Sequence, residues 1–558
     1  MKKIALLVAL VLGLAACSGL PRSGEVNVVP NVQATAGDVV LDAQGPVKGA
    51  DPQEVVEAFI RASAAGLSDN FQVARQYLTD AANAEWDPTA QVRIYPDNQN
   101  QAASVAPNGA IRISVGALAQ LDANGRYSTA SADSVISSEF SLVRNGEGEW
   151  RIAVLDDGVI MSNTLFRSLY ATSSLYFLTA DASALTPDVR WYPKSILVTA
   201  TARGLLAGPS SYLSGATTTA IPAGTALTAT SVEVNNGTAR IELSAEVASL
   251  DAQRLAQVKA QFQASMLSTG QVQLVELSVA GSDLPVPSSL DLTAYPYATY
   301  SLAVLKDGVP GTYRDGQVQP MFSALNGLRL TDLARNYDEN QISMAALSDD
   351  GTQLYLITRT SLSQMPVLDG KMLIHPSIDR YGLVWTGALE SDGQLIVVDP
   401  VTRARHTVAA PWMAGANVRR VAISREGARA AIVLEKDGQV TIYVAGIERD
   451  ATTDIPRAVS EPMRVGNRLT DVLDIAWTGE SRLAAIAKTA TGSERGLYIV
   501  TIGGLMGSMN TVQGATSLTA GRGEESIILT TDDGTLYEYD SGAWRVLDTS
   551  VSEPALPG

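Results

Sequence analysis

The sequence predicts a multidomain protein in which two α+β domains are followed by an all-β propeller of about six blades. Its 558 residues suffice for about three or four domains, because single hydrophobic cores stop growing near 250–300 residues. Helical and strand patterns are mixed in the first half, whereas Asp-Gly turns recur at regular spacing in the second half. Only 18% of the residues are charged and 46 are glycine, a composition that favours short strands and turns.

Residues 1–16 have the order of an export signal. Lys2 and Lys3 provide a positive start, an apolar run follows, and small residues precede Cys17. The apolar run is too short to cross a bilayer as a helix, which takes about 20 residues. Cys17 is the only cysteine in the chain. We therefore expect cleavage between Ala16 and Cys17.

The sequence Leu14-Ala15-Ala16-Cys17 resembles the lipobox of bacterial lipoproteins. In that family the cysteine thiol receives a diacylglyceryl group, the peptide is cut before the cysteine, and the new amine is acylated, for example with palmitate. The resemblance implies S-diacylglycerol and N-acyl groups at Cys17 and a lipid-anchored location on the extracytoplasmic face of the cell membrane. A plain secretory signal with an incidental cysteine is the alternative.

The net charge and residues 17–50 indicate how the protein is attached to the membrane. A formal net charge of −17 disfavours nucleic acid and anionic lipid as partners, so attachment has to come from acyl chains. Residues 17–50 contain three prolines and no helical periodicity, which predicts a flexible tether. As a coil this tether would span roughly 30 Å.

Residues 51–160 predict the first α+β domain. The pattern Asp-Pro-x-Glu that starts at Asp51 is a capping box at a helix start, and a second helix is expected over 71–78. Alternating strands then surround the turn pairs Asn124-Gly125 and Asn145-Gly146. This order of helices followed by an antiparallel meander resembles the NTF2-like scaffold, which hosts enzymes and inert modules alike.

Residues 165–285 predict the second α+β domain. Its helices are separated by a hairpin whose turn contains Asn236-Gly237. The expected elements are a strand over 175–179, a helix over 194–206, hairpin strands over 228–234 and 238–243, a helix over 250–267 and a closing strand over 272–279.

Four motifs in this segment resemble the GerMN (sporulation and germination) domain. They are Arg-Gly-Leu-Leu-Ala-Gly-Pro from Arg203 to Pro209, Ile-Pro-x-Gly-Thr from Ile221 to Thr225, a Val-Glu-Val…Ala-Arg-Ile-Glu-Leu-Ser hairpin and a glutamine-rich helix. Together with the lipobox, the whole order resembles the LpqB family of actinobacterial lipoproteins. That resemblance implies a binding accessory of a sensor histidine kinase of the MtrAB type, with an influence on cell division and cell-wall homeostasis.

Residues 293–550 contain a coarse repeat of Asp-Gly turns between short apolar runs. The aligned turns are separated by one or two units of about 42 to 48 residues, the length of a propeller blade. The missing turns are expected near Leu362 and near 492–496. A β-sandwich is the alternative, but this many regularly spaced hairpins overfills two sheets. The aligned turns are those at Asp307, Asp392, Asp437 and Asp533.

Residues suited to catalysis are scarce. Only His375 and His406 offer imidazole groups, and the one cysteine is assigned to lipid, so an ordinary His/Cys zinc site is not expected. Neither Gly-x-Ser-x-Gly nor Gly-Lys-Ser/Thr occurs. We predict no catalytic, cofactor-binding or metal-binding residues, no cofactor, and a protein that is not an enzyme.

Two carboxylate pairs keep an enzymatic alternative open. Asp349-Asp350 and Asp532-Asp533 could in principle act as acid and base on a cell-envelope glycan, as in a lipid-tethered propeller hydrolase. Each pair stands immediately before glycine in a predicted turn, where Asp is favoured for backbone reasons. Three tryptophans on or beside strands are interpreted as blade packing: Trp385, Trp477 and Trp544.

Overall fold

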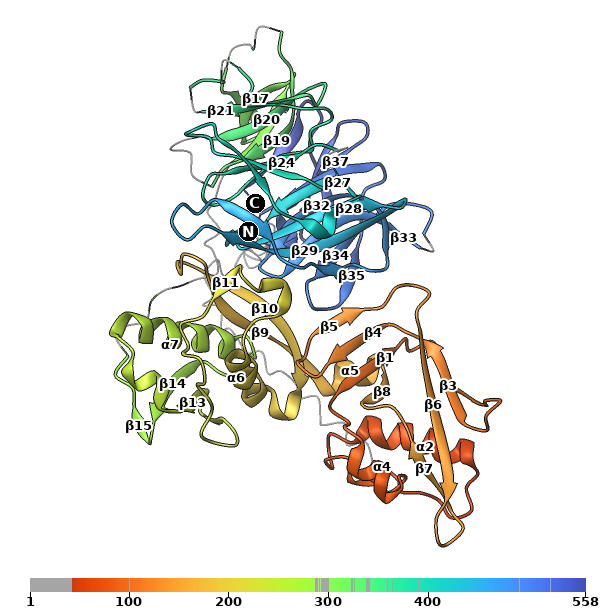
Figure 1. Ribbon diagram of the computed structural model, residues 1–558. Helices are drawn as coiled ribbons and strands as arrows, with labels where there is room; N and C mark the ends of the chain where they lie inside the picture. Colours follow the sequence, from red (N-terminus) through yellow and green to blue (C-terminus); the bar gives the residue numbers. More distant parts are fainter. Residues whose placement is uncertain are drawn as a thin grey trace, which may run out of the picture. The chain divides into compact units, whose positions relative to one another are not determined.

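The computed structural model in Figure 1 describes residues 43–557, except 100, 287–289, 291, 293–300, 323–324, 326, 338–341, 359, 364, 390–391, 491 and 522. The predicted signal peptide, Cys17 and the tether up to residue 42 lie outside the described residues. Within the described part, no helix combines the length and the apolar character that a membrane span requires.

The N-terminal domain places short helices against two antiparallel-rich sheets. Asp51 caps α2 through the predicted capping box, since its carboxylate accepts from the Glu54 amide while the Glu54 side chain accepts from the Asp51 amide. The sheets have the orders β5-β4-β1-β8 and β2-β3-β6-β7. The elements are α2 (Pro52–Ala65), α3 (Gln72–Arg75), α4 (Asp80–Glu85), β1 (Gln91–Tyr95), β2 (Ala102–Val105), β3 (Ile111–Gly116), β4 (Ala119–Asp122), β5 (Tyr127–Thr129), β6 (Val135–Arg144), β7 (Trp150–Val154), β8 (Val159–Ser162) and α5 (Asn163–Leu169).

The helix predicted over 71–78 forms only in part, as the four residues of α3. Phe71 has a φ of 62°, in the left-handed region that interrupts a regular helix, and Leu78 bridges to Ile152 of β7.

The chain before α2 also contacts the N-terminal domain. The Tyr77 hydroxyl donates to the Gln44 carbonyl at 2.7 Å. The Gly49 amide donates to the Glu149 carboxylate at 2.8 Å. Residues 43–50, assigned to the tether from sequence, therefore lie against the domain.

The middle domain has two small sheets, β10-β9-β11 and β12-β13-β14-β15, with helices α6 and α7 packed on β9. The predicted long helix is confirmed in α7, whose Val258, Phe262 and Met266 are fully buried. The elements are β9 (Tyr170–Thr179), β10 (Leu185–Pro193), η1 (Lys194–Ile196), α6 (Leu197–Ala207), η2 (Ser211–Leu213), β11 (Thr217–Thr218), β12 (Glu233–Asn235), β13 (Thr238–Leu243), η3 (Ala245–Ser249), α7 (Ala252–Leu267), β14 (Leu274–Val279) and β15 (Ser282–Asp283).

The C-terminal domain is a propeller, and the described residues form six sheets in it, as predicted. The strands, grouped by sheet, are β16 (Leu302–Lys306), β17 (Val309–Arg314), β18 (Gln317–Pro320) and β40 (Ser552–Ala555); β19 (Leu330–Arg335), β20 (Met344–Ser348), β21 (Gln353–Ile357) and β22 (Leu368–Asp369); β23 (Ser377–Ile378), β24 (Val384–Gly387), β25 (Leu395–Val398) and β26 (Arg405–Val408); β27 (Asn417–Ile423), β28 (Arg429–Lys436), β29 (Gln439–Arg449), β30 (Pro456–Val459) and β31 (Met463–Val465); β32 (Leu469–Gly479), β33 (Arg482–Thr489), β34 (Gly496–Thr501) and β35 (Met506–Met509); β36 (Ala515–Ala520), β37 (Ile527–Thr531), β38 (Leu536–Asp540) and β39 (Ala543–Asp548). Short 3-10 turns, η4 (Pro411–Met413) and η5 (Glu524–Ser526), join some of them.

The ring of blades closes by pairing between the first and last strands of the propeller. The C-terminal strand β40 pairs with β16, so the first blade combines strands from both ends of the domain. The first strands of successive sheets contact one another in the order β40, β19, β23, β27, β32, β36 and back to β40. These six strands, called the inner strands below, surround the propeller axis.

The Asp-Gly turns link the second and third strands of their blades. At Asp307, Asp392 and Asp437 both turn residues have positive φ, as a type I′ turn requires. The turn predicted near Gly492 is confirmed between β33 and β34. The turn predicted near Leu362 is wrong: the equivalent turn of the second blade is at Asp350, between β20 and β21, and residues 358–367 link its third and fourth strands. A turn pair alone does not reveal which two strands it joins.

Candidate functional site

An axial cavity of about 290 Å³ lies among the inner strands of the propeller. Each inner strand, or the loop directly before it, contributes polar or charged side chains to its wall. These residues are Asp332 on β19, His375 before β23, Arg419 and Arg420 on β27, Asp474 on β32, Thr516 and Ser517 on β36, and Glu553 on β40.

Bulges in the inner strands bring charged side chains to this cavity. The pairing registers of β19, β27, β32, β36 and β40 each shift at the level of the cavity. Asp332 and Glu553 lie in two of these bulges with φ values of 49° and 51°. Positive φ is uncommon for residues other than glycine, so the pairing of both strands has to hold these two positions in place.

One ion pair inside the cavity is fully engaged. The Arg420 Nε donates to the Asp474 Oδ1 at 2.7 Å, and both side chains are nearly buried. The Asp474 Oδ2 also accepts from the Leu518 amide at 2.8 Å. Arg420 reaches the His375 carbonyl at 3.4 Å. Asp474 and Arg420 thus neutralise each other and leave the charges of Asp332 and Glu553 uncompensated within this set.

The cavity shifts the pKa values of Glu553, Asp332 and His375. Burial, and then the Asp332 and Asp474 carboxylates, raise the pKa of Glu553 to about 7. Burial also raises the pKa of Asp332, an effect that Arg420 opposes and Asp474 reinforces. Burial, followed by the charge of Arg420, lowers the pKa of His375 well below its ordinary value. The His375 imidazole is therefore neutral at physiological pH.

The two histidines differ in their surroundings. His375 lines the cavity, and its Nδ1 lies 2.8 Å from the Pro376 carbonyl oxygen. His406 lies on β26, the outer strand of its blade. Within the described residues, Asp332, His375 and Glu553 form a group whose ligand-type atoms lie within 4.8 Å of one another. Sequence reasoning singled out His375 but not its two neighbours, because the three come from separate strands and share no local motif.

The carboxylate pairs of the hydrolase alternative serve turns. The Asp350 Oδ1 accepts from the Ser348 hydroxyl at 2.6 Å and from the Thr352 amide at 3.1 Å. The Asp533 Oδ1 accepts from the Thr531 hydroxyl at 2.6 Å and from the Thr535 amide at 3.0 Å. Hydrogen bonds from these threonine and serine hydroxyls lower the pKa of both carboxyls. The second aspartate of each pair, Asp350 or Asp533, is therefore explained by the turn that it stabilises.

The tryptophans pack inside or beside blades, as interpreted. Trp385 and Trp477 belong to two blade cores and are almost fully buried. Trp544 is partly buried against a third core, and its indole donates to the Asn510 carbonyl at 2.8 Å.

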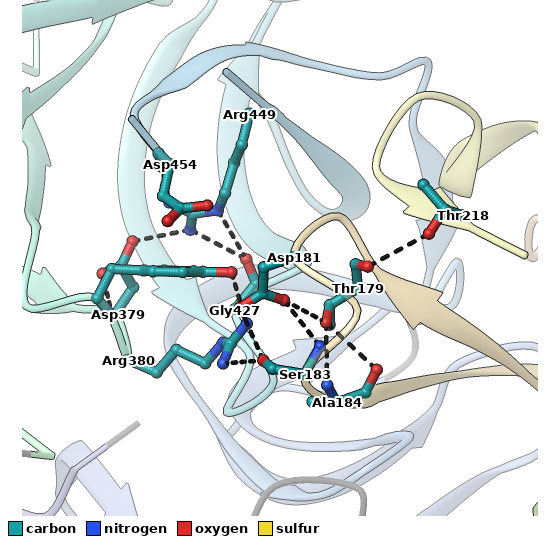
Figure 2. A network of polar contacts seen from close by, with 11 residues as sticks. Thr179, Asp181, Ser183, Ala184, Thr218, Asp379, Arg380, Gly427, Arg449 and Asp454 are labelled. Atoms are coloured by element: carbon teal, nitrogen blue, oxygen red, sulfur yellow. Dashed lines mark hydrogen bonds and ion pairs between the residues drawn. The ribbon is translucent and has the colours of Figure 1, made fainter. Parts of the chain in front are cut away.

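A polar network joins the β9–β10 turn of the middle domain to the propeller (Figure 2). Arg380 of the propeller donates to the Asp181 carboxylate at 2.5 Å and to the Ser183 hydroxyl at 2.8 Å. The Thr179 hydroxyl also donates to Asp181, at 2.6 Å. Burial raises the pKa of Asp181, but the hydrogen bonds from Thr179 and Ser183 and the charge of Arg380 outweigh it and lower the pKa below its ordinary value.

A buried ion pair supports this network from the propeller side (Figure 2). Arg449 donates to the Asp379 carboxylate at 2.8 Å, with side-chain exposures of 2% and 0%. The same carboxylate accepts from the Trp385 indole at 2.9 Å. The Tyr381 ring lies 4.3 Å from the guanidinium of Arg380 and 4.2 Å from that of Arg449. Tyr381 therefore connects the buried pair to the residue that binds the middle domain.

Two aromatic residues of the middle domain lie in the cores of its neighbours. Trp191 of β10 belongs to the N-terminal core, and its indole donates to the Gly503 carbonyl of the propeller at 2.9 Å. Tyr212 and Leu213 of η2 belong to a propeller core that also contains Val444 and Trp477. The middle domain thus shares hydrophobic core with both flanking domains.

Comparison with known proteins agrees with this architecture. Family models match residues 45–167 (lipoprotein LpqB, N-terminal domain), 174–285 (sporulation and spore germination) and 312–557 (lipoprotein LpqB beta-propeller domain). Lipoprotein LpqB of Cutibacterium acnes is 26% identical over 97% of each chain. Lipoprotein LpqB of Streptomyces coelicolor is 26% identical over 87% of this chain and 86% of its own.

Solved structures resemble the chain only in part. TolB from Acinetobacter baumannii aligns with a TM-score of 0.33 and 14% identity, over 46% of this chain and 65% of that chain. A chain of the nidogen/laminin complex aligns with a TM-score of 0.35 and 8% identity, over 46% and 97%.

Two α+β domains that share hydrophobic core with a six-bladed propeller define a multidomain propeller protein. The proteins to which it is similar are named as lipoproteins. The chain belongs to the LpqB lipoprotein family, whose two domain models cover its N-terminal domain and its propeller.

Proposed function

We propose that the protein is a lipid-anchored accessory on the extracytoplasmic face of the cell membrane that acts by binding a sensor histidine kinase of the MtrAB type. Cys17 carries the acyl groups, and residues 18–42 act as the tether. Through the kinase the protein influences cell division and cell-wall homeostasis. The identity of the partner comes from the family resemblance, while the mode of action has support in the structure.

The observation that carries the binding role is the coupling of the three domains through the middle one. Trp191 and Tyr212 insert into two different cores, and Arg380 adds an ion pair. A receptor that contacts one domain therefore meets surfaces held in fixed positions by the others, which lowers the entropy lost on binding. A hydrolase needs no such coupling between three domains.

Co-anchoring strengthens such an interface. Two proteins confined to one membrane meet at an effective concentration that reaches about the millimolar range, so a weak contact suffices. A soluble form without acyl groups should therefore bind the same surface and yet fail to regulate at cellular concentrations.

The test is a reconstitution of the kinase in vesicles with the acylated protein. We expect the acylated protein to change kinase autophosphorylation, and a soluble form that begins after Cys17 to do so only at a much higher concentration. Asp350→Ala and Asp533→Ala serve as controls and should act like the wild type. The hydrolase would replace this proposal if purified protein released products from a cell-wall glycan, or if either control lost regulation with an unchanged melting temperature.

A further inference from the structure

We propose that Asp332, His375 and Glu553 bind a divalent transition-metal ion at the propeller axis. This site goes beyond the proposed function, since kinase binding does not require it. Nothing in the sequence motifs marks it, because its residues lie on three different inner strands or their loops.

The geometry of the three ligands fits one ion. Their donor atoms lie within 4.8 Å of one another. Ligands at about 2.1 Å from a tetrahedral ion are about 3.4 Å apart, so small side-chain rotations complete the site. The bulges at Asp332 and Glu553 hold both carboxylates at the cavity, and the cavity of about 290 Å³ leaves room for water or a fourth ligand.

The hydrogen bond of His375 selects the ring nitrogen that would bind the ion. Nδ1 lies 2.8 Å from the Pro376 carbonyl oxygen, which can only accept, so Nδ1 carries the proton. Nε2 is then left with its lone pair. Metal-binding histidines almost always donate their other ring N–H in this way, often to a backbone carbonyl.

The charges around the three residues also favour a cation. Arg420 is engaged by Asp474, and the neighbouring Arg419 donates twice to Glu435, at 2.7 and 3.0 Å. The Asp332 carboxylate accepts no hydrogen bond from the described residues, and Glu553 accepts only a long one of 3.5 Å from Thr331. Two close carboxylates repel each other when both are ionised, and a divalent ion balances their charge.

The donor set indicates the class of metal. One imidazole disfavours Mg²⁺ and Ca²⁺, which prefer oxygen ligands alone, and the absence of thiolate from the set disfavours Cu⁺. Zn²⁺ and Mn²⁺ accept a mixture of imidazole and carboxylate. We use Zn²⁺ as the probe and Co²⁺, whose visible absorption reports its coordination, as its spectroscopic substitute.

The experiment uses the full-length acylated protein in detergent, freed of metal by a chelator. Equilibrium dialysis should give one Zn²⁺ per chain for the wild type and for His406→Gln, the matched control at the other histidine. His375→Gln and Glu553→Gln should weaken binding at least about tenfold and abolish the Co²⁺ absorption. Added Zn²⁺ should raise the melting temperature of the wild type and of His406→Gln, but not of the two ligand variants.

The proposal is overturned if the wild type retains no Zn²⁺, Mn²⁺ or Co²⁺ after dialysis, or if His375→Gln binds as the wild type does. Loss of binding in His406→Gln alone would also overturn it. Glu553→Gln keeps the size and shape of the side chain, so it tests the site even if His375→Gln fails to fold.

Discussion

At the scale of single residues, the proposed lipid anchor at Cys17 would decide whether the protein stays on the membrane. The formal net charge of −17 disfavours electrostatic attachment to anionic lipid as a replacement for acyl groups. We expect Cys17→Ala to abolish labelling with radioactive palmitate and to stop cleavage after Ala16. The radioactivity of the product measures labelling, and its mass measures cleavage. Membrane fractionation measures how much of the protein stays on the membrane. Mature-length, unlabelled protein that remained in the membrane fraction would show that another anchor exists.

Asp379 carries a buried charge of the propeller. It pairs with Arg449 in a fully buried setting and accepts from the Trp385 indole. Asp379→Asn leaves the Arg449 guanidinium buried without a counter-charge, which should cost about 3 kcal/mol of unfolding free energy in urea.

Asp533→Asn is the matched control for this substitution. Asp533 makes only turn hydrogen bonds at the surface, so its loss should cost about 1 kcal/mol or less. Equal destabilisation by the two substitutions would mean that the buried pair contributes no more to stability than the hydrogen bonds of a surface turn.

At the scale of elements, we expect the β9–β10 turn to make the stability of the folded protein pH-dependent. Contacts in the folded protein lower the pKa of Asp181 below 3.8, so its ionised form stabilises the fold. That stabilisation is complete above about pH 4 and is lost as the pH falls through the lowered pKa. The free energy of unfolding of the wild type should therefore exceed that of Asp181→Asn at pH 7.

The difference between the two proteins should shrink steadily below pH 4. Urea unfolding of both proteins between pH 7 and pH 3 measures it. A difference that stayed constant over this range would show that Asp181 acts through packing rather than charge.

At the scale of the whole molecule, the propeller has the means to fold by itself, but not at full stability. Residues 290–558 contain both β16 and β40, so the ring can close within this fragment. We expect β-type circular dichroism and cooperative melting. The fragment should nevertheless melt below the full-length protein, because Tyr212 and Leu213 no longer cover its core.

A fragment extended to residue 165 should recover the lost stability. Failure of the shorter fragment to fold, with rescue by the extension, would show that middle domain and propeller form one cooperative unit.

The sequence alone was enough for many features that depend on neighbours in the chain. The capping box at Asp51 and the type I′ turns at Asp307, Asp392 and Asp437 follow from the conformations that these residue types prefer locally. The repeat of such turns led to the propeller and its blade number because each blade is itself a local meander. The same local logic held only in part for 71–78, where contact with β7 overrode helical spacing.

Only the tertiary structure decided what depends on residues far apart in the chain. Asp332, His375 and Glu553 meet because the ring closes β40 onto β16 and brings the last inner strand beside β19. The side chains of Trp191 and Tyr212 pack in the cores of neighbouring domains, although their sequence context is that of ordinary strand and turn residues. Hydrophobic burial has no direction along the chain, so periodicity shows that a side chain is buried but not in which core.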